Sequence, residues 1–283
     1  MEMTVKNNSR NGIGVVAGLL GAVCFGFIPV FSKPALALGL SPMCILAYRF
    51  SLAAIALGIL LKLRRVKLSG GCLMMGYEYM SGGVAGVIHF SYPVFVVLIM
   101  LLFFRERVRL SSAVAITAAI AGIYCLGALG GDAAFLPGAN RLEGVLVVVL
   151  SGIGYASYLV GVGKGKARNY DSLYLTFWIL VFTAVFFIAA AALKGELVIV
   201  SDAATLLNFT GLALVATVVA NVLVVYAVKV VGSTLESILS AMEPATSVVM
   251  CIILFDEQFT LPIAIGIVLI FIAVGIVVLS SRR

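Results

Sequence analysis

Five polar side chains recur at helical spacing in the last quarter of the chain. Ser233, Glu236, Ser240, Glu243 and Ser247 follow one another at intervals of three and four residues, which places them on one face of a helix. The residues between them are mostly apolar, and an ionisable group in apolar surroundings is costly and is therefore a functional candidate. We expect this face to line a water-filled cavity or a tight interface between helices.

A second segment carries the counterpart of this polar face. The stretch YPVFVVLIMLLFFRERVRL resembles EPATSVVMCIILFDEQFTL later in the chain, and aligning the two places His89 on Ser240 and Tyr92 on Glu243. If the segments are related by symmetry, the two faces meet near the centre of the molecule. His89 is the single histidine, and its imidazole is either a structural group or a functional group on this face.

Each acidic residue has two interpretations. Glu243 precedes Pro244, which lacks an N–H group and leaves a carbonyl oxygen one turn earlier without its helical partner, so Glu243 is expected to line a cavity. Glu236 lies nearer the end of its helix and either faces that cavity or reaches the lipid headgroups. Small and hydroxyl residues such as Ser240 often serve only to pack helices together. Arg49 stands in an apolar segment and is expected to pair with a carboxylate or to snorkel to the interface. Four residues are predicted to complete the cavity wall: Tyr155, Tyr158, Thr217 and Asn221.

The composition requires a membrane around these residues. Apolar residues make up 63% of the chain and charged residues 11%, whereas soluble domains average about 25% charged residues. Apolar runs long enough to cross a bilayer recur along the chain, and helices satisfy their own backbone hydrogen bonds there. The sequence predicts an all-α integral membrane protein with ten transmembrane helices, at about 12–31, 42–63, 70–79, 83–104, 111–129, 142–162, 172–193, 206–228, 234–254 and 262–279.

The ten segments divide into two repeats of five, at 12–130 and 142–281, joined by an extracytoplasmic linker at 131–141. A second copy of a unit with an odd number of helices must enter the membrane the other way up, so the repeats are predicted to be inverted, as in many secondary transporters. The loop RERVR is basic and its counterpart DEQ is acidic. Because basic loops remain cytoplasmic, both termini are predicted to lie in the cytoplasm of a multi-pass protein of the cell membrane, the inner membrane of a bacterium.

The third segment is unusually short. A helix over 70–79 would extend only about 15 Å at 1.5 Å per residue, half of what a crossing requires. It is either a short, tilted or re-entrant adaptation, or the mark of a truncated homologue that no longer transports.

These motifs resemble those of the EamA-type members of the drug/metabolite transporter superfamily. The resemblance covers nearly the whole chain and is carried by CFGFIPVFSKPAL, YRFSLAAIAL, YMSGGVAGVIHFSYPVFVVLIMLLFFRERV and STLESILSAMEPATSVVMCIILFDEQF. It implies export or exchange of small metabolites such as amino acids. The chain departs from the family in its third helix, which is full-length in other members.

The sequence thus predicts a secondary transporter that exports small metabolites by alternating access. No P-loop, G-x-S-x-G, H-E-x-x-H or metal-spaced Cys/His motif occurs, so we expect no enzymatic activity and no metal or other cofactor. The expected partners are a small-molecule substrate, membrane lipid and protons that drive transport, with no nucleic acid. Glu243 is expected to carry the proton or to bind the ammonium group of a substrate. A transport-defective homologue, a channel and an intramembrane enzyme remain alternatives.

Overall fold

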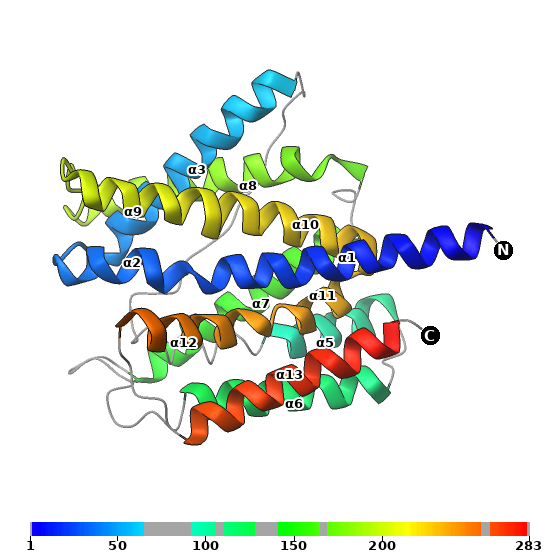
Figure 1. The fold of residues 1–283 in the computed structure, drawn as a ribbon. Helices are drawn as coiled ribbons and strands as arrows, with labels where there is room; N and C mark the ends of the chain where they lie inside the picture. The colour runs from blue at the N-terminus through cyan, green and yellow to red at the C-terminus, as the bar shows by residue number, and fades with distance from the viewer. Residues whose placement is uncertain are drawn as a thin grey trace.

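Helices form every regular element in the described part of the chain. A computed structural model describes residues 2–64, 92–105, 110–127, 141–164, 169–255 and 261–281. Figure 1 shows long helices running roughly parallel or antiparallel to one another, with the start of α1 and the end of α13 at the same end of the bundle. Their bounds are α1 Glu2–Gly26, α2 Ile28–Ala37, α3 Pro42–Arg64, α5 Tyr92–Phe104, α6 Leu110–Gly127, α7 Arg141–Lys164, α8 Ser172–Leu193, α9 Ala203–Ala213, η4 Leu214–Val219, α10 Ala220–Val231, α11 Ser233–Leu239, α12 Met242–Phe255 and α13 Leu261–Ser281.

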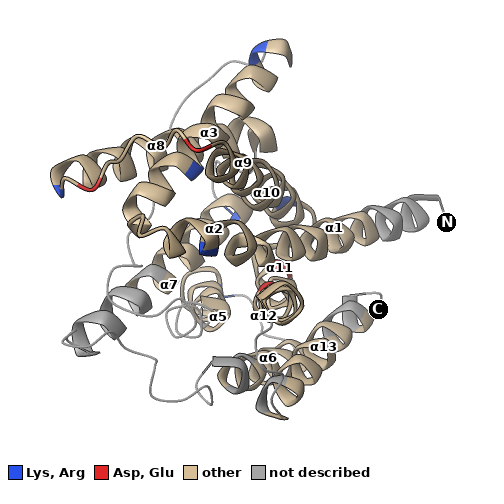
Figure 2. Ribbon diagram, turned by 60° about the vertical axis from the view of Figure 1, so that its left-hand side comes forward, with Lys and Arg blue, Asp and Glu red and all other residues tan. Residues whose placement is uncertain are grey.

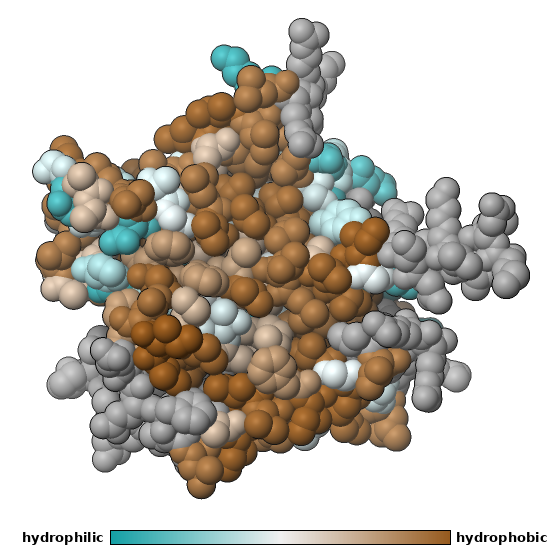
Figure 3. Space-filling model, viewed as in Figure 1, coloured by the Kyte–Doolittle hydropathy of each residue, from teal (hydrophilic) through white to brown (hydrophobic). Residues whose placement is uncertain are grey.

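The prediction of an apolar, all-helical membrane protein is confirmed. Five stretches are long and apolar enough to cross a membrane: Asn11–Ala37, Pro42–Leu63, Ser172–Leu193, Ala203–Val231 and Ser233–Phe255. Shorter apolar helices cover Tyr92–Phe104, Leu110–Gly122 and Ala264–Ile276. Large hydrophobic side chains stand on the outside of these helices, and the surface in Figure 3 is largely apolar. The short helix predicted at 70–79 lies outside the described residues, so the count of ten remains a prediction.

Helices that occupy the same place in the two predicted repeats pack side by side. The second helices, α3 and α8, bury a shared cluster of Leu, Ala and Phe side chains, and the fifth helices, α6 and α13, pair along their length (Figure 1). The fourth helix, α5, packs against α11. In the described residues α1 lies against α10 and α12, whereas its counterpart α7 lies against α5.

Two of the predicted single helices are interrupted near the middle of the bundle. The first is broken at Phe27, between α1 and α2, and the Gly26 carbonyl accepts a 3.1 Å hydrogen bond from the Ser247 hydroxyl on α12. The second is broken after Leu239, between α11 and α12. There Pro244 has no N–H for the Ser240 carbonyl, which accepts from the Glu243 N–H at 2.9 Å instead.

A third irregularity interrupts the helix that connects α9 to α10. Residues Leu214–Val219 form a π-helical turn, a rare feature that is often found at functional sites. The side chain of Thr217 donates to the carbonyl of Leu212 at 2.7 Å. The turn therefore presents backbone and hydroxyl groups to its neighbours at membrane depth.

Aspartates cap the N-termini of two helices, α8 and α9. The Asp171 carboxylate accepts from the N–H groups of Leu173 and Tyr174 at the start of α8, a standard N-cap arrangement. Asp202 caps α9 in the same way, and hydrogen bonds from the Thr205 side chain and backbone lower the pKa of this exposed carboxyl.

One glycine sets the distance between α6 and α13. A Cβ atom at Gly122 would lie 2.7 Å from the Gly266 carbonyl oxygen and 2.9 Å from Ile270, so Gly122→Ala should push the helices apart at a cost of about 1–3 kcal/mol. A Cβ atom at Gly275, on α13, would meet no atom within 4 Å, and Gly275→Ala serves as the matched control. Thermal unfolding in detergent should show a lower Tm for Gly122→Ala only. An equal Tm for both variants would contradict this packing.

Candidate functional site

A buried carboxylate and three tyrosines lie together where the two predicted repeats meet. We call Tyr92, Tyr155, Tyr158, Glu236 and Ser240 the Glu236 cluster. Glu236, on α11, is 0% exposed, and its Oε1 atom accepts a 2.6 Å hydrogen bond from the Ser240 hydroxyl. A second hydrogen bond joins the hydroxyl groups of Ser240 and Tyr92. Since Tyr92 begins α5, this chain of hydrogen bonds links the fourth helices of both halves.

The three tyrosine rings of the cluster lie in a row. Tyr92 and Tyr155 are in edge-to-face contact with ring centroids 4.7 Å apart, and Tyr155 and Tyr158 follow at 5.7 Å. The charge of Glu236 acts on all three tyrosines. Within the described residues, Glu236 Oε2 and the Tyr158 hydroxyl are buried and have no hydrogen-bond partner. Unpaired buried polar atoms of this kind call for a ligand, an ion or a water molecule.

A buried arginine binds the π-helical turn on the other side of the site. Arg49, on α3, is 7% exposed. Its Nε donates to the Thr217 hydroxyl at 2.7 Å and one terminal nitrogen donates to the Ala216 carbonyl at 2.9 Å. The Asn221 amide donates to the Thr217 carbonyl at 2.8 Å. The guanidinium thus uses the groups that the π-turn exposes.

Glu243 lies in the electrostatic field of both groups. The positive charge of Arg49 and the negative charge of Glu236 both act on its carboxylate. Its side chain is partly exposed, as are Tyr155 and Asn221, although all three belong to the inner part of the bundle. Figure 2 shows acidic colour where α11 meets α12, inside the bundle, with few charges on the helices around it.

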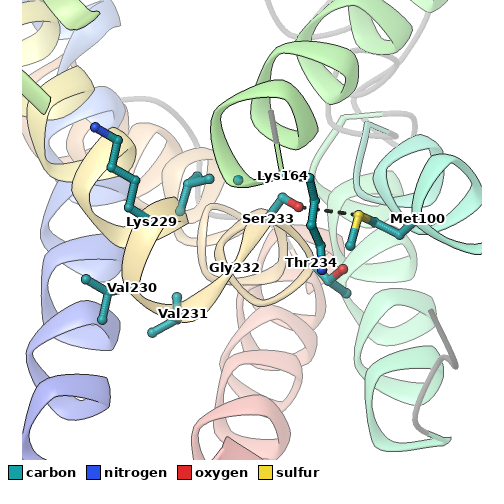
Figure 4. Close-up of a pocket in the computed structure, with 10 residues that line it drawn as sticks. Met100, Lys164, Lys229, Val230, Val231, Gly232, Ser233 and Thr234 are labelled. Carbon is teal, nitrogen blue, oxygen red and sulfur yellow. Dashed lines mark hydrogen bonds between the residues drawn. The ribbon is translucent and has the colours of Figure 1, made fainter. Parts of the chain in front are cut away.

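A cavity of about 260 Å³ opens beside the start of α11. Its lining includes Met100, Lys164, Gly232 and Ser233 (Figure 4). Gly232 makes the turn from α10 to α11 at φ +89°, which glycine adopts without strain. The Ser233 hydroxyl contacts the Met100 sulfur at 3.8 Å and stands one turn before Glu236. Lys229 points away from Ser233 in Figure 4 and donates to the Tyr170 carbonyl.

These groups suit polar recognition inside an apolar protein. The cluster offers a carboxyl group, hydroxyl groups and aromatic rings, and Arg49 adds a buried positive charge. Among the described residues no set of His, Cys, Asp or Glu side chains could hold a metal ion. The arrangement offers hydrogen-bond donors and acceptors that suit a small polar or charged molecule.

The structure brings most of the sequence-predicted residues into two adjoining groups. Tyr92, Tyr155, Tyr158, Glu236 and Ser240 form the first, and the second contains Thr217 and Asn221 beside Arg49; Glu243 couples to both. His89 lies outside the described residues.

For two charged residues the structure excludes one of the two alternatives left open by the sequence. Glu236 does not reach the headgroups, because it is fully buried, and Arg49 does not snorkel, because the π-turn provides acceptors for it inside the bundle. Sequence reasoning left Arg49 out of the predicted site. The available signal was an arginine in an otherwise apolar helix, but its acceptors exist only because of a π-turn that hydropathy does not reveal.

Comparison with known proteins places the sequence in context. The profile of the EamA-like transporter family matches residues 68–128 and 142–279, more than half of the chain, and confirms the resemblance indicated by the motifs. A protein of Archaeoglobus fulgidus described as an uncharacterized transporter is 30% identical over 104 residues, which are 37% of this chain and 34% of that protein. The alignment thus spans about a third of that relative. A solved crystal structure that is 18% identical superposes with a TM-score of 0.72 over 95% of this chain and 98% of the other, a likeness of fold alone.

Proposed function

Because the chain belongs to the EamA-like transporter family, we propose that this multi-pass membrane protein is a secondary transporter that exports small metabolites, such as amino acids, by alternating access. The Glu236 cluster carries the proposal. It joins Tyr92 of the first half to Ser240 of the second through hydrogen bonds, so relative movement of the halves would change the site. Carriers of this kind bind their substrate at such an interface between repeats.

The pairing of helices supports an inverted repeat. Helices in equivalent positions pair across the molecule, namely α3 with α8, α5 with α11, and α6 with α13, as expected of two units related by a pseudo-twofold axis. We propose 12–130 and 142–281 as the two repeats, with both termini in the cytoplasm. Cysteine labelling from outside intact cells should then reach Ile199→Cys, at a side chain that is 90% exposed, and should not reach Lys62→Cys. The opposite result would reverse the orientation.

The two ends of the site differ, in keeping with one step of a transport cycle. At the end formed by α2 and α12, the Lys33 ammonium lies 4.8 Å from the centre of the Phe255 ring and helps to hold these helices together. At the other end, the cavity of about 260 Å³ opens beside Gly232 and Ser233. We propose that this cavity is the entrance on the cytoplasmic side.

Counterflow in proteoliposomes tests the function. Liposomes preloaded with one member of a metabolite panel should accumulate the labelled compound faster than empty ones, because a carrier exchanges substrate faster than it returns empty. Lack of transport for the whole panel would favour the truncated, transport-defective homologue. Transport without acceleration by preloading would favour a channel.

The coupling ion is proposed to be a proton carried by Glu243, because intramembrane carboxylates commonly serve as proton relays. Glu243→Gln cannot ionise, so this variant should retain exchange but lose acceleration by a pH gradient. If Glu243 instead binds the substrate ammonium, substrate affinity should collapse. Gradient-driven transport with wild-type affinity in Glu243→Gln would exclude both roles.

A further inference from the structure

The two carboxylates of the site differ in their electrostatic compensation. Glu243 lies in the field of Arg49. For Glu236, the interactions within the described residues are the hydrogen bond from Ser240 and the burial of the carboxyl group, with no cation among them. A buried carboxylate without a positive partner is unfavourable unless a cation is supplied from elsewhere or the group is neutral.

One oxygen atom of the Glu236 carboxyl group has no hydrogen-bond partner among the described residues. Oε1 accepts from Ser240, whereas Oε2 is buried with no hydrogen-bond partner among the described residues. A hydrogen-bond donor, such as an N–H group, is what this oxygen lacks. The Tyr158 hydroxyl, in the same cluster, is likewise buried without a partner in the part of the chain that the structure describes.

The aromatic rings make the same position favourable for a positive charge. The Tyr155 ring contacts those of Tyr92 and Tyr158, with centroid distances of 4.7 and 5.7 Å. All three rings lie within the field of Glu236. Tyrosine faces attract cations, and most strongly where water is excluded. A carboxylate whose field reaches three tyrosine rings therefore favours an ammonium group over a neutral or anionic group.

We propose that the Glu236 cluster binds the ammonium group of the substrate, with an N–H donating to Glu236 Oε2 and the charge resting against the tyrosine rings. The substrates are then amines or amino compounds that carry a positive nitrogen with at least one hydrogen. Glu243, which lies in the field of Arg49, is left to other tasks. This inference rests on the proposed transport function, because it assigns the substrate class of the same site.

Matched ligand pairs test the proposal on the full chain in lipid nanodiscs. Calorimetry would compare methylammonium, n-butylammonium and 2-phenylethylammonium with methanol, 1-butanol and 2-phenylethanol. At least one ammonium compound should bind about tenfold or more tightly than its alcohol, the factor that a hydrogen bond to a charged group contributes. Glu236→Gln should abolish this preference. Glu236→Asp, which keeps the charge, should retain the preference with weaker binding. If it does, a changed side chain at this position does not by itself unfold the protein, and the loss in Glu236→Gln is due to the lost charge.

One further variant makes the result specific. Glu196→Gln, the same change in the loop after α8, should leave the preference intact. The proposal is wrong if no ammonium compound outcompetes its alcohol, or if the preference survives Glu236→Gln. The transport function is judged separately by counterflow. Transport of neutral or anionic compounds alone would contradict the ammonium site but support the transport function. Ammonium binding without transport would support the ammonium site but contradict the transport function.

Discussion

Replacing Arg49 by Met should destabilise the protein more than any other single substitution considered for this site. The change removes donors to the Thr217 hydroxyl and the Ala216 carbonyl, and each buried partner left unsatisfied costs about 1–3 kcal/mol. It also removes the positive charge that acts on Glu243. We expect a large fall in Tm and in the yield of monodisperse protein. Arg49→Lys should recover little, because a lysine lacks the planar fork that reaches two acceptors at once.

A double-mutant cycle separates the charge from the hydrogen bonds. If Arg49 compensates Glu243, the double variant Arg49→Met/Glu243→Gln should be more stable than the sum of the single effects predicts. The Tm of the four proteins, measured by thermal unfolding in one detergent, gives the coupling. Additive effects would mean that Arg49 stabilises the π-turn alone and that Glu243 has no need of it.

Placing a large ring at Ser240 should abolish transport. Ser240 is 2% exposed and bridges Glu236 to Tyr92, so the indole of Ser240→Trp would occupy the space between the two halves of the site. Transport in proteoliposomes should fall to the level of empty liposomes. Ser240→Ala, which removes the bridge but adds no bulk, should fold and transport with reduced affinity.

The control for this prediction is a Trp substitution on α12, the helix that follows Ser240. Val249, on α12, is 37% exposed on the outside of the helix, so Val249→Trp should transport as the wild type does. Normal transport by a folded Ser240→Trp variant would place the substrate site elsewhere. Loss of transport in both Trp variants would show only that the segment from α11 to α12 tolerates no added ring.

The helical segments were predictable because apolar length fixes them. The segment expected at 172–193 is α8, Ser172–Leu193, and the one expected at 42–63 is α3, Pro42–Arg64. In both, a long apolar run ends at polar or charged residues, and a helix is the structure that satisfies its backbone in lipid. Periodicity also placed Glu236 and Ser240 together, since residues four apart share a helix face.

The interruptions of the helices were not predictable from the same signals. Hydropathy cannot tell whether the Gly26 carbonyl keeps its helical partner or accepts from Ser247. The residue types, and therefore the hydropathy, are the same in both cases. Pro244 did indicate a carbonyl oxygen without its helical donor, but the sequence could not show that the Glu243 N–H would donate to it instead. The π-turn at Leu214–Val219 contains neither glycine nor proline, so no local residue type signals it. It is bound instead by a tertiary contact, since Arg49 donates to it from α3.

Alternating access around Ser240 can be measured directly. Ser240→Cys, in a protein whose five native cysteines are replaced, introduces a small thiol at the junction of the two halves. Modification by a membrane-impermeant thiol reagent would be timed from each side of proteoliposomes, with and without substrate. We expect the thiol to react from the side of the cavity at Gly232 and Ser233 in one state and from the opposite side in another, with substrate changing the ratio of the two rates. Simultaneous reaction from both sides, or reaction from neither side under any condition, would contradict alternating access at this site.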